Sequence, residues 1–227
     1  MVVEANGTER HVPTEVYSKG GKWYAKINSM TNSTYALIQN NVSFTDTTGK
    51  WYAAVATEMA SRKVISGIGE KMFAGDRSIT RAEFAAILIR ALGLPADGTS
   101  IFSDISASAW YSGSVATATQ YGLVTGKGDN RFAPDDYITR QEAMTMLQRA
   151  AKLTGYMGTV GSLENFTDTG SVGTWAQGAA KWNVGSGLIV GSGELLRPND
   201  NISRAESATV ILRLLQRTGL VDVRTEA

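Results

Sequence analysis

Three arginines stand in nearly identical pentapeptides and are the residues best suited to chemistry. The strings are ITRAE, ITRQE and ISRAE, and their arginines are Arg81, Arg140 and Arg204. In each string a Thr or Ser precedes the arginine and a Glu follows two residues later, which is the capping box that initiates a helix. The arginine then occupies the first helical position, where it opposes the positive end of the helix dipole. A guanidinium beside helix N-terminal amides can receive a carboxylate or a phosphate, so the strings predict three anion sites.

Three further landmarks recur at nearly fixed distances before these arginines. A tryptophan lies 29 or 30 residues upstream, at Trp51, Trp110 and Trp175. A glycine loop follows, beginning at Gly67, Gly126 and Gly191. An aromatic-x-Asp pair opens each copy, with its carboxylate at Asp46, Asp104 and Asp168. Landmarks repeated in register three times establish a threefold repeat, and together with the arginines they form the candidate ligand-binding set.

Each landmark also has a purely structural interpretation, and the sequence leaves both open. The arginines could pair with the aspartates of a neighbouring copy. The tryptophans could be core residues, or they could stack on the apolar face of a sugar ring. The glycines suit positive φ in a tight loop and would also let a ligand approach the main chain. The aspartates could cap the first helix of each copy instead of contacting a ligand.

Each copy is predicted to fold as helix, glycine loop, helix. The first helix should begin near the tryptophan and the second at the arginine, where Phe84, Ile87 and Leu88 begin an apolar stripe at helical spacing. Helices of about 12 residues are too short to be stable alone, so the copies should bury their stripes together in a mainly α, pseudo-threefold bundle. The predicted units are residues 42–98, 99–154 and 155–220, the last with a glycine-rich lead-in, followed by a loose C-terminus at 221–227.

Residues 1–41 have a different pattern, typical of β-structure. The stretches Gly21–Met30 and Ser33–Asn40 alternate apolar and polar residues, which predicts two strands joined by Thr31 and Asn32. A lone hairpin is only marginally stable. We therefore expect the segment to be the tail of a preceding β-rich domain or a strand pair packed on the first repeat.

Composition excludes several classes of function. The chain has no cysteine and a single histidine, His11, which argues against metal sites, thiol chemistry and a Ser–His catalytic scheme. Twenty-two Lys and Arg against 21 Asp and Glu leave a net charge of +1, so a broad grip on nucleic acid or anionic lipid is not expected. No apolar run is long enough to insert into a membrane, and no carboxylate pair recurs at catalytic spacing. We expect a binding module without cofactor or metal, not an enzyme.

The registered landmarks resemble three tandem S-layer homology repeats over about residues 42–218. The resemblance rests on FTD…W…GIGEKMF…ITRAEFA and its two counterparts, FSD…W…GKGDNRFAPDDYITRQEA and FTD…W…GSGELLRPNDNISRAESA. It implies an extracellular module on the surface of a Gram-positive or related bacterium. It also implies ligand grooves between adjacent repeats and non-covalent anchoring to a secondary cell-wall polysaccharide attached to peptidoglycan, frequently one that carries pyruvate. The pyruvate would offer its carboxylate to Arg81, Arg140 or Arg204.

Departures from the family pattern predict that the three grooves differ. Repeat 2 has Gln141 where alanine is usual, and repeat 1 has Gly75 where the other copies have Pro134 and Pro198. The fragment is expected to be monomeric. Two other functions remain open from the sequence: a protein–protein scaffold that assembles a surface lattice, and the non-catalytic part of a glycan-active surface enzyme.

Overall fold

The computed structural model describes residues 1–29 and 32–223, and most of its regular structure is helical. No helix among the described residues is long and apolar enough to cross a membrane. The helices, in chain order, are α1 (Ala53–Ser61), α2 (Arg81–Ala91), α3 (Ser112–Gln120), α4 (Arg140–Leu153), the 3₁₀ helix η1 (Thr169–Ser171), α5 (Gln177–Gly185) and α6 (Arg204–Arg217).

The second helix of each repeat, α2, α4 or α6, begins at the predicted arginine. In α2 the Thr80 side chain accepts from the amide of Glu83 at 3.2 Å, and the Glu83 carboxylate accepts from the amide of Thr80 at 2.8 Å. The same reciprocal capping box starts α4 and α6. The first helices, α1, α3 and α5, begin two residues after each tryptophan, but each spans only nine residues, fewer than the sequence pattern suggested.

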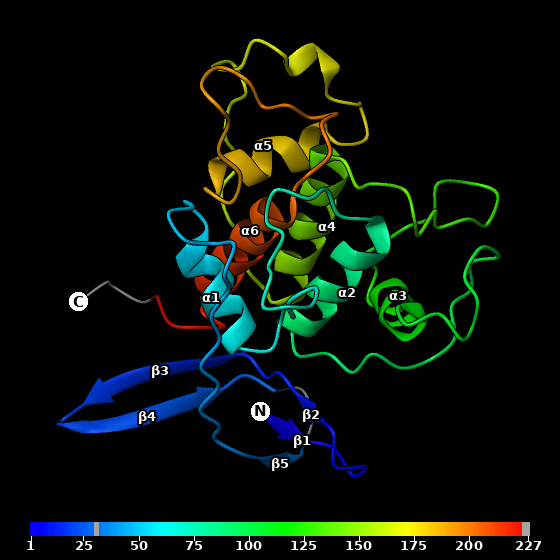
Figure 1. Cartoon of the computed structure of the whole chain (residues 1–227). Helices are drawn as coiled ribbons and strands as arrows, with labels where there is room; N and C mark the ends of the chain where they lie inside the picture. Colours follow the sequence, from blue (N-terminus) through cyan, green and yellow to red (C-terminus); the bar gives the residue numbers. More distant parts are fainter. Residues whose placement is uncertain (30–31, 224–227) are drawn as a thin grey trace.

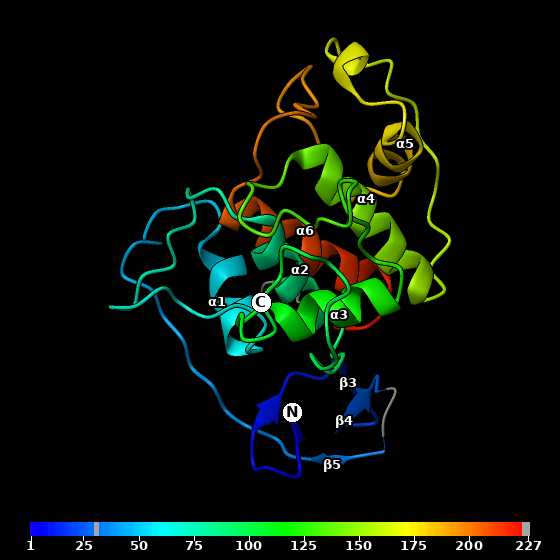
Figure 2. The same cartoon turned by 90° about the vertical axis from the view of Figure 1, so that its right-hand side faces the viewer.

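The first helix of each repeat packs on the second helix of another repeat. Helix α3 packs on α2, α5 packs on α4, and α1 packs on α6 (Figure 1). The second helices lie at the centre of the molecule, where α6 contacts both α2 and α4 (Figure 2). A repeat is therefore not a self-contained packing unit, because its two helices bury their apolar faces against helices of other repeats.

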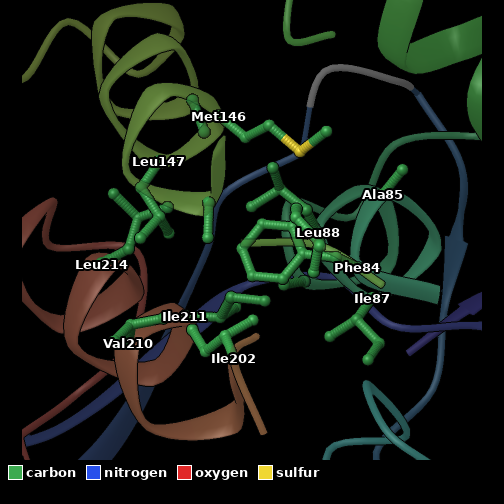
Figure 3. Packing of buried hydrophobic residues seen from close by; sticks show 14 of the residues in the cluster. Phe84, Ala85, Ile87, Leu88, Met146, Leu147, Ile202, Val210, Ile211 and Leu214 are labelled. Atoms are coloured by element: carbon green, nitrogen blue, oxygen red, sulfur yellow. The ribbon is translucent and has the colours of Figure 1, made fainter. Parts of the chain in front are cut away.

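The apolar stripes predicted for the second helices form the shared core. Figure 3 shows Phe84 and Leu88 of α2, Leu147 of α4, and Ile211 and Leu214 of α6 packed together, and all five are at most 1% exposed. Burial of this size supplies roughly 1.5–3 kcal/mol per side chain, which lets helices of 11 to 14 residues persist.

The predicted hairpin exists, but its partner strand and turn were wrong. Strand β4 (Lys22–Ile27) pairs antiparallel with β3 (Thr14–Lys19), not with the segment after it. The turn is Gly20–Gly21, whose positive φ angles of 60° and 73° suit a two-residue hairpin turn. Of the predicted turn and strand end, Met30 and Thr31 lie outside the described residues.

The remaining strands form a second small sheet with the order β2-β1-β5. Both pairings within it are antiparallel. Its strands are β1 (Val2–Val3), β2 (Glu9–Arg10) and β5 (Thr34–Tyr35).

The N-terminal segment is hydrogen-bonded to the helical body at two places, just after α1 and just after α6. Arg62, just after α1, donates to the carbonyl of Thr14 at 3.4 Å. The side chain of Asn28 donates to the carbonyl of Leu220, after α6, at 3.2 Å. The tip of the β3–β4 hairpin extends away from the helices (Figure 1).

We expect Leu147→Ala to destabilise the chain by about 2–5 kcal/mol, because Leu147 is fully buried and its removal leaves a cavity. The matched control is Leu37→Ala, since Leu37 is 93% exposed and should change stability by no more than about 0.5 kcal/mol. Urea unfolding of both variants measures the difference. Equal effects of the two substitutions would refute the core assignment.

The stability of the chain should fall as the pH drops below about 6.5. Burial lowers the pKa of His11 to about 3 from the ordinary 6.5, and the positive charge of Arg62 acts in the same direction. Between these values the unfolded chain binds a proton that the folded chain does not, so up to about 1.4 kcal/mol is lost per pH unit. His11→Gln should flatten this slope in urea titrations between pH 7 and 5. An unchanged slope would show that His11 does not titrate as described.

Candidate functional site: grooves between the repeats

The arginine that begins each second helix is buried and reaches into the next repeat. Arg81 is 4% exposed. Its Nε donates to the carbonyl of Phe132 at 2.9 Å, and its Nη1 donates to Oε1 of Glu142 at 2.9 Å. The guanidinium also lies over the Phe132 ring, with 4.9 Å between its carbon and the ring centroid. We call this set of contacts the latch between repeats 1 and 2.

A latch with the same arginine–glutamate pair connects repeat 2 to repeat 3, and a latch that keeps the carbonyl contact but lacks this pair connects repeat 3 back to repeat 1. Arg140 donates to the carbonyl of Leu196 at 3.0 Å and to Glu206 at 3.0 Å. Arg204 donates to the carbonyl of Phe73 at 2.9 Å. The contacts therefore run in a cycle, and the last one joins residues 131 positions apart in the sequence.

The latch glutamate is the residue that also caps its own helix. One oxygen of Glu142 accepts from the amide of Thr139 at 2.8 Å, and the other pairs with Arg81. Burial lowers the pKa of Arg81, and the negative charge of Glu142 opposes this shift. The sequence-based alternative of an ion pair between the arginine and a neighbouring aspartate was therefore right in kind and wrong in partner.

The helix N-terminal amides are not available to a ligand. The amide of Arg81 donates to the carbonyl of Asp136 at 2.9 Å, and the amide of Ala82 donates to the carbonyl of Pro134 at 3.1 Å. The next amide, that of Glu83, donates to the Thr80 side chain. The predicted receptor of guanidinium plus helix amides does not form, so any anion here is held by side chains.

The three landmark aspartates accept hydrogen bonds from backbone amides at the end of each glycine loop. The carboxylate of Asp104 accepts from the amides of Phe132 at 2.9 Å and Ala133 at 2.7 Å, and Ala133 has a positive φ of 58°. Burial acts to raise the pKa of Asp104, but the backbone hydrogen bonds it accepts, together with the charge of Arg131, outweigh burial and lower the pKa. Asp46 and Asp168 make the same pair of bonds in their repeats. The first helices carry no side-chain cap, so the expectation that the aspartates cap them was wrong.

The first glycine of each loop is required by close packing and not by positive φ, contrary to the expectation from sequence. A Cβ on Gly126 would lie 2.7 Å from the carbonyl of Arg131 and 2.9 Å from the Phe102 ring. Gly67 and Gly191 meet the corresponding atoms of their repeats at 2.3–3.1 Å. Positive φ falls instead on the residues two further along, such as Gly128.

Three cavities lie along the latches, and each is lined by residues from all three repeats. The cavity volumes are about 520, 400 and 200 Å³. Groove 1 is lined by Arg81, Gly126, Glu142, Arg149 and Trp175, groove 2 by Arg140, Gly191, Glu206, Arg213 and Trp51, and groove 3 by Arg204, Gly67, Glu83, Arg90 and Trp110, each with further residues. The structure thus brings together the predicted arginines, glycines and tryptophans, whereas the aspartates line none of the three grooves.

The tryptophans are surface residues. Trp51, Trp110 and Trp175 are 65%, 67% and 59% exposed, which rules out the core interpretation. A half-exposed indole at the mouth of a polar groove presents a flat apolar face to a ligand.

A second arginine in each groove was missed by the sequence analysis. It lies nine residues after the latch arginine, at Arg90, Arg149 and Arg213, and this constant offset was a visible signal. Arg149 and Arg213 each donate to a backbone carbonyl, of Leu123 at 3.5 Å and Leu188 at 3.2 Å. Among residues 1–29 and 32–223, none of these arginines has a carboxylate within ion-pair distance.

A third cation comes from a different position in each groove. It is Lys127 in groove 1, Arg197 in groove 2 and Arg77 in groove 3. Each groove is therefore lined by three cationic side chains and one glutamate, an excess of positive charge in a chain whose net charge is only +1. Within the described part of the chain, no cluster of His, Asp or Glu suits a metal ion.

The departure at Gly75 has a steric explanation. A Cβ at position 75 would lie 2.3 Å from the ring of Tyr52, which is 2% exposed. The repeats that carry Pro134 and Pro198 have the half-buried Tyr111 and the small Ala176 at the position of Tyr52. The space that proline needs in repeat 1 is thus taken by a buried tyrosine.

Comparison with known proteins assigns the family. The S-layer homology domain matches at residues 43–85, 101–144 and 165–208. The chain belongs to the S-layer homology family, a family of non-catalytic modules that anchor proteins at the cell surface.

The chain is similar to regions of much larger proteins. It is 35% identical over 170 residues to the surface-layer 125 kDa protein of Lysinibacillus sphaericus, covering 73% of this chain and 14% of that protein. It is 31% identical over 208 residues to an amylopullulanase of Thermoanaerobacterium thermosulfurigenes, covering 88% and 11%. It is also 31% identical over 164 residues to a cellulosome-anchoring protein of Acetivibrio thermocellus, covering 67% and 35%. The family and these relatives place the chain at the cell surface.

Proposed function

We propose that the chain anchors a larger surface protein without a covalent bond, by binding a secondary cell-wall polysaccharide in the grooves between its repeats. The observation that carries the proposal is the composition of grooves 1 and 2. Each combines an excess of positive charge, an exposed tryptophan and a volume within the range of small-ligand sites. An acidic sugar, such as a pyruvylated one on a polymer attached to peptidoglycan, carries the complementary carboxylate and an apolar ring face.

Two arginines would share the recognition in each of grooves 1 and 2. The latch arginine Arg81 already donates to Glu142 and to a backbone carbonyl, so few of its donors remain for a ligand. Arg149 has no carboxylate partner among the described residues and keeps most of its five donors. The ligand carboxylate would therefore lie against Arg149, in a groove whose wall the latch holds in place, and Trp175 would stack on the sugar ring. In groove 2 the corresponding residues are Arg140, Arg213 and Trp51.

The cycle of three latches supports a pseudo-threefold arrangement of three repeats at about residues 42–98, 99–154 and 155–220. Each groove draws on all of them, so the binding unit would be the monomeric triplet and not a single repeat. The region before it, residues 1–41, would pack on the repeats as an accessory segment.

Co-sedimentation with purified cell walls tests the proposal. The chain should pellet with untreated walls and stay in solution with walls from which the secondary polysaccharide has been removed. A tube without walls controls for self-association. Equal binding to both wall preparations would point to peptidoglycan itself, and pelleting without walls would point to lattice assembly; either result would overturn the proposal.

Arg149→Gln combined with Arg213→Gln should weaken wall binding at least ten-fold, because each change removes a charge-assisted hydrogen bond worth about 1.5–3 kcal/mol. The melting temperature should stay close to that of the unchanged chain, since neither arginine is part of a latch. Arg217→Gln is the matched control, because Arg217 is exposed and lines none of the three grooves. Wild-type affinity in the double variant would refute the assigned role.

A further inference from the structure

We infer that groove 3 is a site for a compact dianion, a phosphate group, and that it differs in ligand from grooves 1 and 2. Its volume of about 200 Å³ lies below the range typical of pockets for drug-sized ligands, whereas the volumes of the other two grooves lie within that range. The inference does not rest on the proposed saccharide function, because it concerns a different cavity and a different chemical group.

A single difference in sequence changes the charge pairing in groove 3. Four residues before the latch arginine, repeats 2 and 3 carry Asp136 and Asp200, which pair with Lys127 at 3.1 Å and Arg197 at 2.8 Å. Repeat 1 carries Arg77 at this position. Repeats 2 and 3 thus have a carboxylate at this position, and repeat 1 has a guanidinium.

Arg77 forms an ion pair with Glu83, the glutamate that corresponds to Glu142 and Glu206 of the other two latches. Its Nη2 donates to Oε1 of Glu83 at 2.6 Å. This is the oxygen whose counterparts in Glu142 and Glu206 accept from the latch arginines. In the third latch, no ion pair joins Arg204 to a carboxylate anywhere in residues 1–29 and 32–223.

Groove 3 therefore contains two arginines without a carboxylate partner, Arg204 and Arg90. Arg204 is 6% exposed, and its Nε and Nη2 donate to the carbonyls of Phe73 and Ser66. Its Nη1, the atom that binds glutamate in the other two latches, has no acceptor within the described part of the chain.

The pKa shifts of these arginines agree with an anion site. Burial lowers the pKa of Arg204 to about 10, and the nearby positive charges of Arg77 and Arg90 act in the same direction against Glu83. Burial alone lowers the pKa of Arg90. A buried cation that has lost its partner is costly, so a bound dianion would restore the balance that Glu142 and Glu206 provide in the other grooves.

Phosphate matches this arrangement better than a carboxylate. A phosphate monoester carries a charge of about −1.5 to −2 at neutral pH, and phosphate offers several acceptor oxygens in a small volume. Arginine binds it with paired, charge-assisted hydrogen bonds. The phosphate could be free in solution or be a monoester on a cell-wall polymer, and both present the same group.

Isothermal titration calorimetry with inorganic phosphate and with glycerol phosphate tests the inference on the full chain. The unchanged chain should bind one phosphate group, more weakly as NaCl is added. Tighter binding of inorganic phosphate would identify free phosphate as the source, and tighter binding of glycerol phosphate would identify an ester. No binding of either probe would overturn the inference.

Arg77→Asp should weaken phosphate binding at least ten-fold, because it restores the residue type of repeats 2 and 3 and releases Glu83 to pair with Arg204. Arg217→Asp makes the same change of charge on an exposed residue outside the grooves and should bind phosphate as before. Arg90→Gln, which leaves Glu83 and Arg77 in place, should also weaken phosphate binding at least ten-fold. This second variant tests the site if Arg77→Asp does not fold. Wild-type affinity in both groove variants would overturn the assignment, whatever the outcome of the wall-binding experiment.

Discussion

The buried arginine at the start of each second helix is the interaction on which the rest of the structure depends. Arg81 and Arg140 are charged groups in an environment that penalises charge, so each needs its glutamate and its carbonyl acceptor at the same time. Removing one partner of such a pair typically costs 3–5 kcal/mol. Because those partners belong to the next repeat, the requirement fixes one repeat against another and sets the wall of the groove between them.

The cyclic packing extends this dependence to the whole chain. Helix α1 buries its apolar face on α6, at the other end of the sequence, and the last latch joins Arg204 to Phe73. No repeat can satisfy its own apolar surface or its own arginine. Each groove therefore depends on three repeats at once, and a change in one repeat alters grooves that the other two repeats also line. The position held by Arg77 illustrates this, since it alters the partners of an arginine in repeat 3.

The sequence predicted local features well and through-space partners poorly. The capping boxes, the starts of the second helices and their buried stripes follow from periodicity and helix chemistry, and the structure confirms them. The partner of Arg81 could not be found this way, because Glu142 has a complete local role as a capping residue and only its second oxygen serves the latch. The sequence left the exposure of the tryptophans open, and its expectations for Asp104 and for the partner of strand β4 were wrong, because all three depend on contacts between segments that are distant in the sequence. Arg149 is different, since its constant offset was readable and was overlooked.

A double-mutant cycle on Arg140 and Glu206 tests the central claim most directly. Urea unfolding would be measured for Arg140→Gln, Glu206→Gln and the double variant. Each single change should be strongly destabilising, and the double variant should lose less than the sum, with a coupling free energy of about 0.5–3 kcal/mol. If the two single effects simply add, the latch contributes no interaction of its own, and the account of how the repeats and their grooves are held together is wrong.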